Sequence, residues 1–209
     1  MDVLTASRTV IPVLTIPRAS DAVLLARALV RGGIRILEVT LRTAAAAEAV
    51  ALIQAEVPEA IIALGTLTTE ADVALAHRLN VGLCFSPGAT PALLKAARDA
   101  RMTFVPGVQT ASDLMMAAEF GYHVVKFFPA VPAGGLAALK ALAAPFPRTR
   151  FCPTGGIDES SMQQWLSLPY VFAVGGSWLA TPQDLEQCNW SAIEHKAGRV
   201  RDLLSACSR

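Results

Sequence analysis

The chain contains 209 residues, of which 53% are hydrophobic and 17% are charged, so it has ample material for one sizeable apolar core and is not a disordered chain. Lys and Arg number 18 and Asp and Glu number 17, which leaves a formal net charge of +1. So small a net charge provides no overall attraction to nucleic acid or to an anionic membrane, and neither is expected as a partner.

Short β-branched or aromatic runs alternate with Ala- and Leu-rich helical stretches along the whole chain, which predicts an α/β fold with a parallel sheet. Eight strand–helix units of about 26 residues each predict a compact (β/α)8 TIM barrel with few insertions. The predicted strands are residues 10–16, 35–41, 60–66, 81–86, 103–107, 123–128, 150–154 and 171–174.

The helices expected between these strands begin near residues 20, 44, 69, 90, 111, 133, 158 and 184. Three of them have start signals in the sequence, at Ser20-Asp21, Thr90-Pro91 and Asp158-Glu159. An open doubly wound sheet is the alternative architecture, but the glycine-rich loop expected after its first strand is missing. No linker or shift in composition divides the chain, so residues 1–209 are predicted to form a single domain.

No segment of the sequence is expected to span a membrane. The longest uncharged run, residues 160–183, is interrupted by polar residues, a proline and two glycines, and a membrane helix needs about 20 continuous apolar residues. The amino-terminal residues show no basic segment followed by an apolar stretch and a small-residue cleavage site. We therefore expect a cytoplasmic protein.

The cysteines, histidines and tryptophans show no functional spacing. Cys84, Cys152, Cys188 and Cys207 are widely scattered and are predicted to be reduced thiols. The three histidines are equally isolated, so no metal ion is expected, and no other cofactor is indicated either. The three tryptophans are interpreted as packing residues, because no basic residues are interleaved with them.

Lys126 is the lysine whose surroundings need an explanation, because it interrupts the apolar run HVVKFFP. Alternation along a strand places it on the same side as Val124 and Phe128, and since the helix-facing side must be apolar, the lysine is expected inside the barrel. Burial disfavours the ammonium form, and a neutral amine can attack a carbonyl group to form a Schiff base. A structural lysine paired with a carboxylate is the alternative interpretation.

Glu38 is the expected partner of this lysine. In the second predicted strand, RILEVTLRT, Glu38 has the same parity as Thr40 and Arg42, and the alternate positions are apolar and face the helices. An acid and an amine then share one cavity, where Glu38 could act as a general acid and base. Arg42, nearer the rim, could hold a carboxylate with its guanidinium group. An internal ion-pair layer that only stabilises the barrel is the alternative.

Paired glycines follow the last two predicted strands, at Gly155-Gly156 and Gly175-Gly176. Glycine allows backbone N–H groups to approach a ligand, and the loops at these two places form the usual phosphate site of such barrels. Thr154 and Ser177 supply hydroxyl groups beside them. The ends of the third and fourth strands, at Thr66 and Pro87, could line the cavity or could be ordinary turns.

Six motifs occur in order along the chain, namely EVTLRT, GT, SPG, KFFPA, FCPTGG and GGSW. They resemble the family of 2-keto-3-deoxy-6-phosphogluconate (KDPG) and 4-hydroxy-2-oxoglutarate (KHG) aldolases, and the similarity extends from about residue 9 to residue 185. The resemblance implies a metal-free class I aldolase of the Entner–Doudoroff pathway that cleaves a phosphorylated keto acid to pyruvate and glyceraldehyde 3-phosphate. It also implies a homotrimer.

The same resemblance assigns roles to the residues of these motifs. Lys126 would form the Schiff base and Glu38 would accept and donate protons. Arg42 and Thr66 would bind the carboxylate of the pyruvate half, and Thr154 would set the stereochemistry of the aldehyde pocket.

The remaining motif residues are assigned to substrate binding. Gly155, Gly156 and Ser177 would bind the phosphate. Pro87 of SPG and Phe128 of KFFPA would line the substrate site. Together with the roles above, these assignments predict a site that extends over strand ends all round the barrel.

The third strand end departs from the family pattern, because Ala63-Leu64-Gly65-Thr66 stands where the family typically has G-A-G-T. The Arg42-Thr43 pair favours the gluconate-derived substrate over its galactonate-derived relative, which is the first alternative. A phosphosugar isomerase or decarboxylase on the same barrel is the second alternative, and a non-catalytic sensor of a phosphorylated metabolite is the third.

Overall fold

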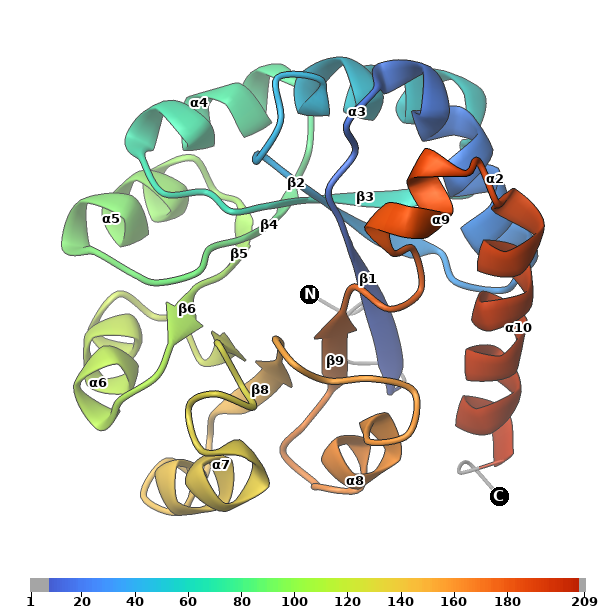
Figure 1. Ribbon diagram of the computed structural model, residues 1–209. Helices are drawn as coiled ribbons and strands as arrows, with labels where there is room; N and C mark the ends of the chain where they lie inside the picture. Colours follow the sequence, from blue (N-terminus) through green and yellow to red (C-terminus); the bar gives the residue numbers. More distant parts are fainter. Residues whose placement is uncertain (1–7, 207–209) are drawn as a thin grey trace.

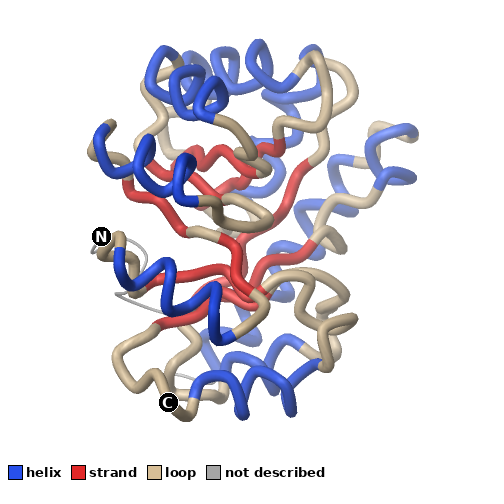
Figure 2. Tube along the Cα trace, turned by 90° about the vertical axis from the view of Figure 1, so that its left-hand side faces the viewer, coloured by secondary structure: helices blue, strands red, loops and turns tan. Residues whose placement is uncertain are grey.

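The computed structural model describes residues 8–206 and contains a curled parallel sheet with helices around it (Figure 1). Figure 2 shows strands inside and helices outside from a second direction. The strands are β1 (Thr9–Leu14), β2 (Ile36–Thr40), β3 (Ile61–Gly65), β4 (Leu83–Phe85), β5 (Thr103–Val105), β6 (Gly107–Val108), β7 (Val124–Phe127), β8 (Arg150–Pro153) and β9 (Ala173–Gly176). The helices are η1 (Ala19–Asp21), α2 (Ala22–Arg31), α3 (Ala46–Glu56), α4 (Glu70–Arg78), α5 (Pro91–Asp99), α6 (Ala111–Glu119), α7 (Gly135–Ala143), α8 (Met162–Leu166), α9 (Pro182–Glu186) and α10 (Trp190–Ala206).

The strands pair in parallel in two sheets, with the orders β5-β4-β3-β2-β1-β9 and β6-β7-β8. A strand occurs at every predicted position, and the prediction of an α/β fold with a parallel sheet is confirmed. The predicted strand 103–107 is interrupted at Pro106, because proline has no N–H group to donate to a neighbouring strand. Isolated parallel bridges join Phe151 to Val171 and Thr154 to Gly175.

Thr90-Pro91 starts α5 as the sequence predicts. The Thr90 hydroxyl accepts a hydrogen bond from the backbone N–H of Leu93, and Pro91 occupies the first turn of the helix, where its missing N–H costs nothing. At the other end of the chain, α9 begins close to the predicted position near residue 184, and α10 follows it without a predicted counterpart.

The other two start signals lie close to helices but do not cap them. Asp21 makes no capping hydrogen bond, because its carboxylate accepts from Nε of Arg18 at 2.8 Å. Asp158 accepts from the backbone N–H of Ser161 at 2.9 Å within a turn, and α8 begins only at Met162. In both places the carboxylate accepts a hydrogen bond from a donor outside the helix, and it caps no N–H group in the first turn of the helix.

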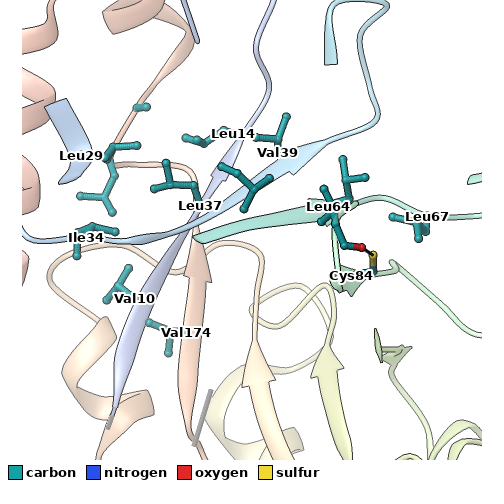
Figure 3. Packing of buried hydrophobic residues seen from close by; sticks show 14 of the residues in the cluster. Val10, Leu14, Leu29, Ile34, Leu37, Val39, Leu64, Leu67, Cys84 and Val174 are labelled. Atoms are coloured by element: carbon teal, nitrogen blue, oxygen red, sulfur yellow. Dashed lines mark hydrogen bonds between the residues drawn. The ribbon is translucent and has the colours of Figure 1, made fainter. Parts of the chain in front are cut away.

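The strands separate two apolar clusters. The outer cluster lies between the strands and the helices and includes Leu37, Val39 and Leu64 (Figure 3). The inner cluster consists of residues from the opposite faces of the strands, among them Ile36 and Phe85. This division follows the alternation predicted from the sequence, because Ile36 and Leu37 are neighbours that face opposite sides.

Leu64 belongs to the outer cluster and is completely buried. The departure from the family pattern at the third strand end therefore changes the packing between sheet and helices, not the inner face of the sheet.

Among the described helices, none combines the length and apolar character needed to cross a membrane.

Shortening Leu64 to alanine is expected to destabilise the fold by about 2–5 kcal/mol, because a cavity remains where the buried side chain packed. Urea unfolding of Leu64→Ala measures this change. Leu24→Ala is the matched control, since Leu24 is 47% exposed and its truncation should change the unfolding free energy by less than about 0.5 kcal/mol. Equal destabilisation of the two variants would contradict the assignment of Leu64 to the core.

Candidate active site

Lys126 and Glu38 form an ion pair inside the curled sheet. Nζ of Lys126 on β7 lies 2.8 Å from Oε1 of Glu38 on β2, although the two residues are 88 positions apart in the sequence. Only 4% of Lys126 and 1% of Glu38 is exposed. The rings of Phe85 and Phe128 flank the amine, with centroids 5.5 Å and 5.6 Å from Nζ. The amine and the acid are thus held in direct contact and largely away from solvent.

Gly65 provides the space for the Glu38 carboxylate. A Cβ atom built on Gly65 would collide with Oε1, Cγ and Cδ of Glu38, and the two strands are paired in register. Any side chain at this position would displace the acid from the lysine. Gly65 stands in the sequence only as part of a strand-end motif, because a glycine does not reveal whose side chain occupies the space beside it.

A cavity of about 340 Å³ opens next to the ion pair. Lys126 lies in its wall, and seven predicted site residues line it altogether, namely Arg42, Lys126, Phe128, Thr154, Gly155, Gly156 and Ser177. Gly176 of the second glycine pair is also in the lining, which is completed by residues without a predicted role, namely Val13, Thr15, Ile157, Trp178, Thr181 and Pro182. The cavity therefore connects the ion pair to both glycine loops.

Three predicted site residues lie outside this lining, namely Glu38, which contacts Lys126 in the cavity wall, and Thr66 and Pro87. Thr66 follows Gly65 directly and has a φ of 66°, a left-handed conformation that is uncommon for a β-branched residue. The main chain of Pro87 packs against Gly107, where a Cβ atom would collide with the Pro87 carbonyl group. Both residues stand at strand ends beside the site, in partly buried positions.

Arg42 lies beyond the end of β2 in a loop that is tied to β1. The hydroxyl of Thr43 donates to the carbonyl oxygen of Ile16 at 2.7 Å, which fixes the residue next to Arg42. The Arg42 side chain makes no ion pair within the described part of the chain. An exposed cation at the cavity is thus available to an anionic group of a ligand.

The glycine loops have the backbone geometry of an anion site. Gly155 and Gly156 have φ values of 104° and 80°, which only glycine adopts readily. Within residues 8–206, the backbone N–H groups of Gly156 and Ser177 have no hydrogen-bond acceptor. Gly175 leaves room for the Thr154 side chain, because a Cβ atom built on Gly175 would collide with the Thr154 hydroxyl. Free N–H groups beside the cavity suit a phosphate group.

The interpretation of Trp178 as a packing residue is incomplete. Its ring packs over Gly176, where a Cβ atom would collide with it, but the residue also lines the cavity. Its indole Nε1 is buried and has no hydrogen-bond partner among residues 8–206. The GGSW motif contained this residue, and its position directly after Ser177 was the signal that could have identified it.

Cys152 lies beside Lys126 in the register of β7 and β8 but is not a competing nucleophile. Burial raises the pKa of the Cys152 thiol to about 12, so it stays protonated at neutral pH. Cys84 and Cys188 are also free thiols, and Cys207 lies outside the described residues. No group of three or more potential metal ligands occurs within residues 8–206.

Adding a methyl group at Gly65 is expected to break the ion pair. Since removing one partner of a buried pair leaves an uncompensated charge, Gly65→Ala should lower the unfolding free energy by about 3–5 kcal/mol. Gly82→Ala is the matched control, because a Cβ atom there meets nothing within 4 Å. Urea unfolding compares the two variants, and equal stabilities would contradict the steric role of Gly65.

Comparison with known proteins identifies close relatives of the chain. A family model described as KDPG and KHG aldolase matches residues 2–196. The 2-dehydro-3-deoxy-phosphogluconate aldolase of Pseudoalteromonas atlantica is 45% identical over 188 residues, which are 90% of this chain and 87% of the relative. The KHG/KDPG aldolase of Escherichia coli K12 is 43% identical over 184 residues, which are 88% of this chain and 86% of the relative.

A solved structure shows the same similarity in three dimensions. The KDPG aldolase of Legionella pneumophila, with pyruvate captured at low pH as a covalent carbinolamine, superimposes with a TM-score of 0.91 at 41% identity. The alignment covers 95% of this chain and 96% of that one. Because sequence and fold agree over nearly the whole length, the chain belongs to the KDPG and KHG aldolase family.

Proposed function

We propose that the protein is a class I aldolase, a carbon–carbon lyase that cleaves KDPG to pyruvate and glyceraldehyde 3-phosphate and also acts on KHG. The observation that carries this proposal is the contact of 2.8 Å between Nζ of Lys126 and Oε1 of Glu38 beside the cavity. Covalent catalysis by an amine needs a proton acceptor within hydrogen-bond reach, and this geometry provides one.

The reaction starts with a proton transfer within the pair. Glu38 takes a proton from Nζ of Lys126, which gives a neutral amine and a neutral acid. The amine attacks the C2 ketone of the substrate to form a carbinolamine. The protonated Glu38 then returns its proton to the carbinolamine oxygen, which leaves as water and produces the iminium.

The iminium accepts the electrons of the bond that breaks. Glu38, ionised again after the loss of water, takes the proton of the C4 hydroxyl, directly or through one water; the aldehyde forms, the C3–C4 bond breaks, and its electron pair moves into an enamine on Lys126. Glyceraldehyde 3-phosphate leaves, C3 of the enamine takes up a proton, and water hydrolyses the iminium to pyruvate. The water consumed here balances the water released when the iminium formed.

Substrate binding follows the distribution of polar groups along the cavity. Arg42, with Thr66 beside it, would bind the C1 carboxylate. Gly155, Gly156 and Ser177 would bind the C6 phosphate, for which the free N–H groups and the left-handed glycines provide support.

The remaining assigned residues shape the middle of the site. Thr154 would contact the carbon chain of the aldehyde half, and its position in the cavity lining supports this role. Phe128 would border the iminium, and Pro87 would close the fourth strand end. The Arg42-Thr43 pair favours the gluconate-derived substrate over the galactonate-derived one. A coupled assay of both epimers and KHG compares the three substrates.

The architecture and the assembly are part of the same proposal. A closed (β/α)8 barrel over a single domain, residues 1–209, is supported by the isolated parallel bridges beside β8 and β9 and by the hydrogen bond from Lys126 N to Pro106 O, which extends the pairing of β6 with β7 to the residue that joins β5 to β6. A homotrimer and a cytoplasmic location remain predictions. Native mass spectrometry tests the trimer.

Incubation with pyruvate and sodium borohydride is expected to attach one reduced pyruvyl group to Lys126, which intact and peptide mass spectrometry detect. Lys126→Arg keeps a positive charge opposite Glu38 but cannot form an imine at ordinary pH, so it should lose both the adduct and the cleavage of KDPG. Lys95→Ala is the control, because Lys95 is exposed and forms a surface ion pair with Asp99. Substantial cleavage by Lys126→Arg, or an unmodified Lys126, would refute the aldolase and favour a non-covalent enzyme.

Glu38→Gln should lower the turnover number by about 10²–10⁴-fold, since proton transfer by a positioned group supplies this factor. Slow adduct formation with pyruvate should persist, because the amine remains. Stopped-flow measurement of cleavage together with borohydride trapping separates the two effects. Turnover within threefold of the unsubstituted protein would contradict the role of Glu38.

A further inference from the structure

Two threonines connect the ends of β1 and β2 at the rim of the cavity. The hydroxyl of Thr40 donates to the carbonyl oxygen of Leu14 at 3.0 Å, and the hydroxyl oxygens of Thr40 and Thr15 lie 3.2 Å apart. Thr40 is completely buried, whereas Thr15 is exposed and lines the cavity. A ligand in the cavity can therefore reach Thr15 but not Thr40.

The direction of these hydrogen bonds is determined by the number of protons. A threonine hydroxyl has one hydrogen and two lone pairs, and a carbonyl oxygen only accepts. Thr40 uses its single hydrogen for the Leu14 carbonyl, so both bonds form only if Thr15 donates to Thr40. The hydrogen of Thr15 is then engaged, and its hydroxyl presents only lone pairs to the cavity.

Thr15 lies between the two regions that suit anions. In the register of β1 and β2, Val13 pairs with Glu38, so Thr15 lies two residues farther along, about 6–7 Å toward the strand ends. β1 is flanked by β2, which leads to Arg42, and by β9, which leads to Ser177. Thr15 thus lies one layer above the ion pair, between the carboxylate and the phosphate positions.

A group that only accepts hydrogen bonds discriminates among the parts of a substrate. A carboxylate and a phosphate dianion also only accept, so Thr15 offers neither of them a hydrogen bond. A hydroxyl group of the substrate can donate to it. The carbon chain between the ketone and the phosphate of a sugar-derived keto acid contains such hydroxyl groups, at C4 and C5.

We propose that Thr15 is a specificity residue that accepts a hydrogen bond from a hydroxyl group in the aldehyde half of the substrate, with Thr40 as the positioning residue that fixes its direction. The proposal rests on the aldolase function proposed above. It assigns to the end of β1 the recognition of the part of the substrate that leaves as the aldehyde, whereas Lys126 forms its covalent bond with the pyruvate half.

Thr15→Val tests this role, because valine keeps the branched shape and removes the acceptor. We expect kcat/KM for KDPG cleavage to fall about tenfold, the effect of losing one hydrogen bond to a neutral group. Exchange of the C3 protons of pyruvate with deuterated water, followed by NMR, involves no aldehyde half and should stay within twofold. Thr15→Ser restores the acceptor and should recover most of the cleavage activity.

Two further measurements locate the interaction. KHG has the C4 hydroxyl but no C5 hydroxyl, so a loss of KHG cleavage in Thr15→Val assigns the hydrogen bond to C4, and unchanged KHG cleavage assigns it to C5. Thr40→Val frees the Thr15 hydrogen and should lower kcat/KM for KDPG by a smaller factor than Thr15→Val.

Three outcomes would overturn the proposal. They are cleavage of KDPG by Thr15→Val within twofold of the unsubstituted protein, an equal loss of pyruvate exchange and cleavage, and failure of Thr15→Ser to recover cleavage. A failure of the aldolase function itself looks different, because the unsubstituted protein would then catalyse no pyruvate exchange. Thermal unfolding of each variant verifies that the fold is retained.

Discussion

The structure depends on one costly interaction, the contact between Lys126 and Glu38 in the interior of the sheet. Two charges that leave water lose several kcal/mol of hydration free energy each, and only close geometry and mutual hydrogen bonding offset this cost. The sheet must therefore curl until β2 and β7, which belong to separate sheets, place their side chains in contact. The same curl brings the loops after β8 and β9 to the cavity beside the amine.

Glycines make this arrangement sterically feasible, and each creates space for a different side chain. Gly65 leaves space for the Glu38 carboxylate, Gly175 for Thr154, and Gly176 for the ring of Trp178. The inner face of a sheet is otherwise packed to the density of a crystal, and a reactive group can stand there only if a neighbouring position has no side chain. The glycine pairs after β8 and at the end of β9 have a second role, because the backbone N–H groups of Gly156 and Ser177 lie beside the cavity there.

The features that depend on alternation could be predicted from the sequence, and the features that depend on pairing between distant strands could not. The parity of RILEVTLRT and HVVKFFP placed Glu38 and Lys126 on the inner face, and the structure has them there. The steric role of Gly65 and the hydrogen-bond direction at Thr15 follow from which residue stands opposite on the next strand, and the sequence of one strand does not contain that register. The interruption at Pro106 is local and was recognisable from proline alone.

The ion pair and the residues that we propose select the substrate lie at different depths in the cavity. The ion pair forms the lower layer, and every 2-keto acid presents the same ketone to it. Thr15, Thr154 and the glycine loops form the upper layer at the strand ends, where substrates that share the pyruvate half differ in hydroxyl position and charge. Since the upper residues lie on loops or on the last positions of strands, they can be exchanged without breaking the sheet that holds Lys126 against Glu38. On the roles proposed here, the aldehyde half of the substrate could change while Lys126 and Glu38 stay the same, because the residues proposed to contact that half lie at strand ends and in loops beside the ion pair.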